Sequence, residues 1–233
     1  MLIPIKDERS RPNTFPIVVV GLIGINVIVF LYEFLLMGTS DKAINSFIFH
    51  YGMIPRAVTN GAPGAIFTMF SNIFIHGGFL HLLGNMLFLW IFGDNVEDIL
   101  GSVQFLVFYF LCGIGADIGH ILMDPHSAIP SIGASGAISG VLAAYVRYFP
   151  KNRITNFFWI YFQAGFFQLR AVYYIAIWFL MQLFFGALTG SSSGVAYGAH
   201  IGGFITGLII IHLFPKRQEA LDYYRASHGY EED

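Results

Sequence analysis

Residues 16–36 read PIVVVGLIGINVIVFLYEFLL, an apolar run in which Glu33 is the only charged residue. A helix needs about 20 such residues to cross the hydrocarbon core of a bilayer, because backbone groups cannot be left unpaired in lipid. The run is too long for the core of a signal peptide, and it lacks a small-x-small cleavage site. The sequence therefore predicts a transmembrane helix here.

The rest of the chain has the same character. Of its 233 residues, 12 are Lys or Arg and 14 are Asp or Glu, so that 11% carry a charge. An ordinary soluble domain has about 25%. So few charges could not cover a water-soluble protein, which excludes a cytosolic enzyme, a nucleic-acid-binding protein and a disordered chain. Further uncharged stretches cover 57–93, 125–146 and 174–215.

These stretches predict an all-α polytopic membrane protein with a bundle of six transmembrane helices. The expected spans are 16–36, 78–97, 104–123, 132–149, 171–189 and 195–214. Together they form one membrane domain, 16–214, in which a long loop over 38–77 joins the first two helices. The flanking segments 1–15 and 215–233 are expected outside the membrane.

Lys and Arg residues are spread unevenly over the two sides of this topology. One side holds ten of them: Lys6, Arg9, Arg11, Arg147, Lys151, Arg153, Arg170, Lys216, Arg217 and Arg225. The other side holds Lys42 and Arg56. Because cytoplasmic loops are enriched in Lys and Arg, both termini are expected to be cytoplasmic. With no transit peptide in view, a prokaryotic cytoplasmic (inner) membrane is the expected location.

Six polar side chains in the predicted spans are costly in lipid unless they face a partner or a water-filled cavity. They are His81, Asn85, Asp117, His120, Ser135 and His200. Any one alone could simply hydrogen-bond between helices. However, the second, fourth and sixth helices all enter from the outer side. His81, Ser135 and His200 then lie within about one turn of that surface, with Asn85 one turn below His81. The matching depths predict a shared site.

Small residues accompany two of these groups. Ser135 stands in Gly133-Ala134-Ser135-Gly136, and Gly140 follows one turn later. On the sixth helix, Ala199, Gly203 and Gly207 repeat at the same four-residue spacing. Small-xxx-small faces let helix backbones approach closely. Such an approach would bring the hydroxyl of Ser135 to the ring of His200.

The motifs resemble those of the rhomboid intramembrane serine proteases. The matching motifs, in the family's order, are His76-x4-His81-x3-Asn85, Gly133-Ala134-Ser135-Gly136 and Ala199-His200-x2-Gly203-x3-Gly207. Glu97 and Gly101 also look like the family's short cytoplasmic turn. The resemblance implies that Ser135 is the nucleophile and His200 the general base, and that His81 and Asn85 form the oxyanion hole with Ser135. One departure is Ser139, where some members carry an aromatic residue under the histidine ring.

The chemistry of these groups agrees with that role. A neutral histidine can take the proton that makes a serine hydroxyl nucleophilic, and the product is an acyl-enzyme. No carboxylate accompanies the two motifs, so a dyad is expected rather than a triad. Asp117 is expected to pair locally with His120, three residues on, and His76 is expected to be structural. The fifth helix and the loop 190–194 are the expected gate for substrate.

The sequence leaves two other functions open. A haem- or metal-binding membrane protein could use His81, His120 and His200, but no H-E-x-x-H motif or cysteine ligand supports it, and no cofactor or metal is expected. A catalytically inactive relative that binds membrane segments should have lost one of the site residues. The expected partners are single-span or other transmembrane protein substrates and the lipid bilayer, with no nucleic acid.

Overall fold

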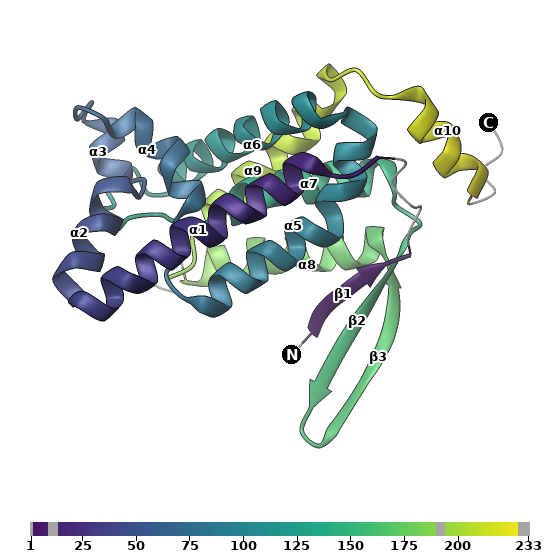
Figure 1. The fold of residues 1–233 in the computed structure, drawn as a ribbon, viewed down its shortest axis with the longest axis horizontal. Coiled ribbons are helices and arrows are strands. Elements are labelled where there is room, and N and C mark those ends of the chain that lie inside the picture. Colours follow the sequence, from purple (N-terminus) through teal and green to yellow (C-terminus); the bar gives the residue numbers. More distant parts are fainter. Residues whose placement is uncertain (1, 9–13, 190–193, 228–233) are drawn as a thin grey trace.

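The computed structural model describes residues 2–8, 14–189 and 194–227 and is mostly helical (Figure 1). Six helices correspond to the predicted spans: α1 (Ile17–Thr39), α5 (Phe79–Leu100), α6 (Ser102–Met123), α7 (Ser135–Tyr148), α8 (Ala171–Thr189) and α9 (Tyr197–Ile210), the last continued by a 3-10 turn, Ile211–Leu213. The membrane-type helical bundle is therefore confirmed.

Among the described residues, four helices are long and apolar enough to cross a membrane, namely α1, α5, α6 and α8. Helices α7 and α9 have 14 residues each. At about 1.5 Å per residue they are shorter than a bilayer core, so they cross it only together with their flanking segments. Six crossings remain a prediction.

The predicted loop between the first two spans is largely helical. It contains α2 (Asp41–Tyr51), α3 (Pro55–Thr59), α4 (Ala65–Ser71) and a 3-10 turn, Asn72–Phe74. Ser40 ends α1 in an extended conformation and then caps α2, where its side chain accepts a hydrogen bond from the backbone N–H of Ala43 at 3.2 Å. Helices α2 to α4 gather at one end of the bundle, opposite α10 (Gln218–Ser227) (Figure 1).

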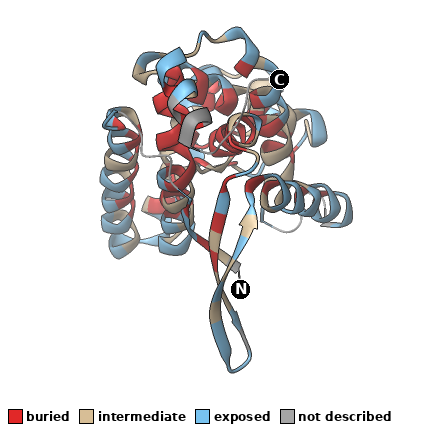
Figure 2. Cartoon of the chain, turned by 90° about the vertical axis from the view of Figure 1, so that its right-hand side faces the viewer, coloured by how far each residue is buried: buried red, intermediate tan, exposed pale blue. Residues whose placement is uncertain are grey.

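Helix α7 lies in the centre of the bundle, and its residues 136–145 are all buried. Its glycines and alanines let neighbouring helices pack closely. Figure 2 shows the burial concentrated in the middle of the bundle, while the outer helices expose much of their surface. That surface is apolar, with side chains such as Ile28, Leu35 and Leu180 more than half exposed. Lipid rather than water suits such a surface.

A three-stranded antiparallel sheet stands beside the helices, and the sequence analysis did not predict it. Strands β1 (Leu2–Asp7), β2 (Arg153–Ile160) and β3 (Gln163–Arg170) lie in that order, with β2 and β3 forming a hairpin. The segment 150–170 reads as a connection because its uncharged part, residues 154–169, is only 16 residues long, shorter than the about 20 that a transmembrane helix needs. Its pairing with β1 joins residues about 150 positions apart, which no local pattern reveals.

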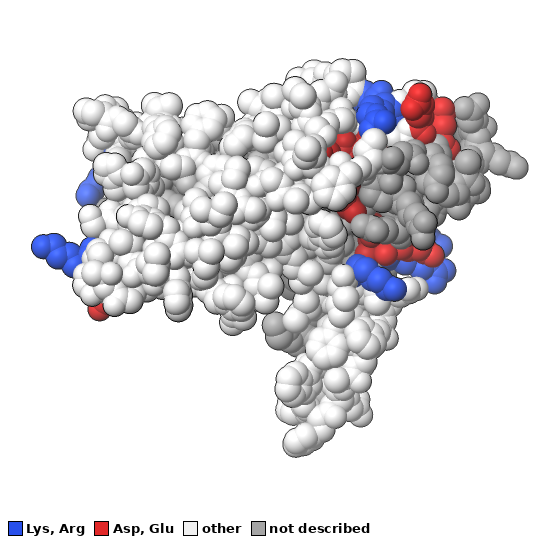
Figure 3. Space-filling view, in the orientation of Figure 1, with Lys and Arg blue, Asp and Glu red and all other residues white. Residues whose placement is uncertain are grey.

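Charged side chains gather at the end of the bundle near α10 (Figure 3). There the Glu97 carboxylate accepts hydrogen bonds from the backbone N–H groups of Val18 and Val19, at 3.0 and 2.8 Å, in the first turn of α1. A carboxylate at a helix N-terminus complements the helix dipole. Gly101, with a φ of 78°, makes the turn between α5 and α6. The acidic residue and the glycine thus both have local structural roles.

Candidate active site

Ser135 and His200 are in contact. The Ser135 Oγ lies 2.8 Å from the His200 Nε2, a hydrogen-bonding distance. Ser135 is the first residue of α7, and His200 lies in the first turn of α9. The structure thus brings together the two groups that the sequence analysis paired from their depth in the membrane.

Glycines let α7 and α9 approach closely enough for this contact. A Cβ at Gly203 would collide with the carbonyl oxygen of Gly136, and one at Gly207 would lie 2.5 Å from that of Gly140. Gly140 itself packs against Cys112 of α6. These are the glycines that the four-residue spacing singled out. A second set that the sequence analysis did not name, Gly119 and Gly202, brings α6 and α9 together in the same way.

The other ring nitrogen of His200 also has a partner. Its Nδ1 lies 2.9 Å from Oε1 of Gln182, which extends from α8. The Gln182 amide nitrogen donates to the carbonyl oxygen of Trp178 at 3.3 Å, so its oxygen faces the histidine. An amide oxygen only accepts hydrogen bonds, so Nδ1 carries the proton and Nε2 is free to accept from Ser135.

Gln182 is a site residue that the sequence analysis missed. The signal that could have found it is its amide, which stands in a helix without charged residues. The indole ring of Trp178 lies 5.9 Å from the ring of His200, so an aromatic neighbour comes from α8 rather than from position 139. Ser139 instead donates its hydroxyl to the carbonyl oxygen of Ser135 at 2.6 Å.

His81 and Asn85 both lie beside Gly133, two residues before the serine. A Cβ at Gly133 would lie 2.7 Å from His81 Nε2 and 3.7 Å from Asn85 Nδ2, and the φ of 116° at this position also favours glycine. The Asn85 Nδ2 is buried without a hydrogen-bond partner. The first backbone N–H groups of α7 lack intrahelical acceptors as well. Donors therefore surround the start of α7.

A cavity of about 740 Å³ opens onto these groups. His81, Ser135 and His200 line it, as do Asp117 and His120 of α6. It lies between the helices at the end of the bundle that carries few charges in Figure 3. Asn85 is buried behind this lining.

Asp117 does not pair with His120, so that expectation was wrong. One oxygen of its carboxylate accepts a hydrogen bond from Asn72 Nδ2 at 2.8 Å, while Nδ1 of His120 is buried without a partner. Residues three apart share one face of a helix, but the 3-10 turn packs against α6 and supplies a nearer partner. No group of three or more His, Cys, Asp or Glu side chains within the described part of the chain is arranged to hold a metal ion.

His76 lies in the loop before α5 and is fully buried. Its backbone N–H donates to the carboxylate of Glu33 in α1, with both oxygens at 3.1 Å, and its ring packs edge-on against that of His81 at 5.1 Å. Burial and the neighbouring His81 lower the pKa of His76 to about 4, so the ring is neutral. The residue connects α1 to the start of α5, near His81.

Comparison with known proteins identifies the family. The model of the Rhomboid domain family matches residues 63–217. RHOMBOID-like protein 5 of Arabidopsis thaliana is 28% identical over 148 residues, which cover 64% of this chain and 45% of that protein. Rhomboid protease GluP of Bacillus subtilis is 39% identical over 92 residues, 40% of this chain and 18% of that protein. The human mitochondrial presenilin-associated rhomboid-like protein is 29% identical over 144 residues, 60% of this chain and 35% of that protein. The chain thus spans less than half the length of these relatives.

Proposed function

The chain belongs to the rhomboid family of integral membrane proteins, and we propose that it is a serine endopeptidase that cleaves other membrane proteins in or near their transmembrane segments. The observation that carries this proposal is the 2.8 Å contact between Ser135 Oγ and His200 Nε2 at the wall of the cavity. Protease names among the relatives support the same reaction class.

In the proposed reaction, His200 Nε2 takes the hydroxyl proton while Ser135 Oγ attacks the carbonyl carbon of the scissile peptide bond. The resulting imidazolium then gives its proton to the amine as the peptide bond breaks. The amine departs, and the acyl group stays bound to Ser135 Oγ as an acyl-enzyme. Water then attacks the acyl carbon while His200 takes one of its protons, and the imidazolium returns that proton to Ser135 Oγ as the bond to the acyl group breaks and the carboxylic acid product leaves. Gln182 holds the Nδ1 proton throughout, which keeps the ring in the tautomer that this cycle needs.

The negative charge of the tetrahedral intermediate would lie beside Gly133 and the first turn of α7. The backbone N–H groups there, the unpaired Nδ2 of Asn85 and the His81 ring are the proposed donors. Donors that are fixed in advance stabilise the oxyanion without reorganisation. The dipole of α7 adds to this effect at the helix N-terminus.

The substrate must present an extended peptide, because the carbonyl groups of a helix are already hydrogen-bonded. A transmembrane substrate would therefore unwind near the cavity, and water would reach the acyl-enzyme from the outer side. The proposed location is a prokaryotic inner membrane, and the Lys and Arg distribution supports an orientation in which the site faces outward. Helix α8 remains the proposed gate. Of the neighbouring loop 190–194, residues 190–193 lie outside the described residues.

The test is incubation of the protein in proteoliposomes with single-span membrane proteins. We expect cleavage by the wild type and none by Ser135→Ala. Ser139→Ala is the matched control, because it removes a hydroxyl one turn further along the same helix, and it should retain most activity. A fluorophosphonate probe should label Ser135 in the wild type only. Specific binding of the substrates without cleavage or labelling would instead identify an inactive relative.

A further inference from the structure

The β2–β3 hairpin exposes aromatic side chains that neither the fold nor the proposed reaction explains. We call Trp159, Tyr161, Phe162 and Phe166 the aromatic tip; they are 61%, 89%, 100% and 67% exposed. From residue 154 to residue 169 the hairpin contains no Asp, Glu, Lys, Arg or His. An aromatic projection of this kind marks an interaction surface.

Polarity changes steadily along one face of the hairpin. Directly opposed residues of an antiparallel pair share a face, and on this face the successive pairs from base to turn are Arg153–Arg170, Thr155–Gln168, Phe157–Phe166 and Trp159–Ala164. The face is thus cationic at its base, polar in the middle and aromatic towards the turn. This order matches the passage from lipid phosphates to the acyl boundary of a bilayer.

The position of the hairpin agrees with that order. It leaves the bundle at the end near α10 and slants back beside the helices, so that its turn lies level with α5 and α8 rather than beyond their ends (Figure 1). Figure 2, seen from that end, shows it pointing away from the bundle. In Figure 3 the charged side chains gather where the hairpin begins, and the projecting part of the hairpin carries no charged side chain.

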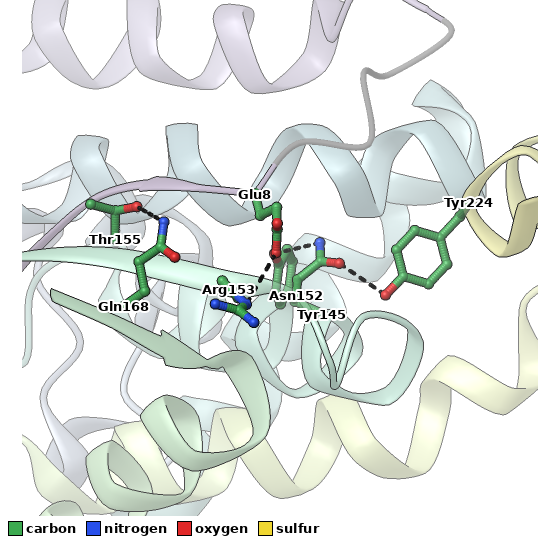
Figure 4. A network of polar contacts seen from close by, with 7 residues as sticks. All are labelled: Glu8, Tyr145, Asn152, Arg153, Thr155, Gln168 and Tyr224. Carbon is green, nitrogen blue, oxygen red and sulfur yellow. Dashed lines mark hydrogen bonds and ion pairs between the residues drawn. The ribbon is translucent and has the colours of Figure 1, made fainter. Parts of the chain in front are cut away.

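The base of the sheet is held firmly against the helices. The carboxylate of Asp7 in β1 accepts hydrogen bonds from Asn95 of α5 and from the hydroxyl of Tyr145 in α7, at 2.9 and 2.8 Å. Asn152, just before β2, donates to that hydroxyl at 3.1 Å and accepts from Tyr224 of α10 at 2.9 Å (Figure 4). The hairpin is therefore an extension of the bundle with a fixed direction.

We propose that the hairpin lies in the interfacial layer of the bilayer on the side that is rich in Lys and Arg, with the aromatic tip at the level of the first acyl carbons and the arginines of the base near the lipid phosphates. Trp, Tyr and Phe side chains favour this layer. The depth is limited by the backbone, because β3 is an edge strand and its outer N–H and C=O groups could not be left unpaired in the hydrocarbon core.

A fluorescent label on the tip tests this proposal without reference to proteolysis. Phe162→Cys provides an exposed thiol, while the protein's own Cys112 is buried, so the labelled wild type gives the background. Each protein carries an environment-sensitive dye and is reconstituted into phosphatidylethanolamine–phosphatidylglycerol vesicles. Nitroxide lipids with the quencher near the headgroup or near the chain end, and iodide on both sides of the membrane, report depth. The matched control is Glu219→Cys in α10, exposed at the same end of the molecule.

We expect the label at position 162 to emit at shorter wavelength than the label at position 219. It should lose most of its emission to the headgroup-proximal nitroxide and little to iodide, whereas the label at 219 should show the reverse. Trp159→Cys, on the same hairpin, should behave like Phe162→Cys and shows that the result does not depend on one substitution. Iodide quenching equal to that at position 219 would place the tip in water and overturn the proposal. Protection from both nitroxide lipids and from iodide would also overturn it, because protein rather than lipid would then cover the tip.

Discussion

Nδ1 of His200 lies 2.9 Å from Oε1 of Gln182, so an uncharged amide occupies the place where a carboxylate completes a catalytic triad. The amide fixes the tautomer, and in a helix that faces lipid it does so without the cost of a charge. The two residues come from α9 and α8, which makes the relative position of these helices part of the proposed catalytic geometry.

Gln182→Leu should therefore lower kcat and leave KM nearly unchanged. A carboxylate in this position contributes up to about 10,000-fold in kcat, and we expect about 10- to 100-fold from the neutral amide. Gln182→Glu, which can still accept from Nδ1, is the matched variant and should be the more active of the two. Steady-state cleavage in proteoliposomes measures both. Equal activity of Gln182→Leu and the wild type would show that the ring is oriented by packing alone.

Ser135→Ala and His200→Ala should each abolish cleavage while the helical protein stays folded. Since the two side chains act as a unit, the double variant should be scarcely slower than either single variant. Rates of product formation, together with circular dichroism and thermal unfolding, check the expectation. If the double variant's fold-reduction in cleavage rate equals the product of the fold-reductions of the two single variants, the residues act independently.

Asn85→Ala should lower kcat by about 10- to 1000-fold with a smaller effect on KM, because an oxyanion donor acts mainly in the transition state. His81→Ala should change kcat in the same direction. Substrate titration separates kcat from KM. A raised KM with unchanged kcat would instead identify these side chains as substrate contacts.

Gly203→Val should reduce both activity and stability. Its side chain would meet the carbonyl of Gly136, and a shift of about 1 Å between the nucleophile and the base can cost about 100-fold in rate. The melting temperature should fall as well, because membrane helices associate through packing. Gly24→Val in α1, where nothing lies within 4 Å, is the control and should change neither. An active and equally stable Gly203→Val protein would contradict the role of this close approach.

His76→Ala should mainly lower the melting temperature. The ring is buried against His81, and its loss leaves a cavity between α1 and α5. Large-to-small changes at buried positions cost about 2 to 5 kcal/mol. At temperatures well below unfolding, kcat should stay within a few-fold of the wild type, measured by cleavage alongside thermal unfolding. A large loss of kcat at full stability would move His76 into the catalytic machinery.

Several features of this protein follow from its sequence alone. The membrane class and the positions of the six main helices do, because apolar runs such as 16–36 and 174–215 are properties of a chain in one dimension. The partnership of Ser135 with His200 could also be predicted, since topology sets the depth of a residue in the membrane and the glycine spacing marks which helix faces can meet.

The tertiary structure alone decided which side chains face each other across helices. Gln182 reaches His200, Asn72 reaches Asp117 in place of His120, and Trp178 lies near the histidine ring. Sequence gives the depth of a residue, whereas these contacts depend on how each helix is rotated about its axis, which is set by packing against all its neighbours. The sheet has a similar origin, because β1 and β2 pair across about 150 residues of intervening chain, and the hydrogen bond from Tyr145 to Asp7 holds β1 against α7.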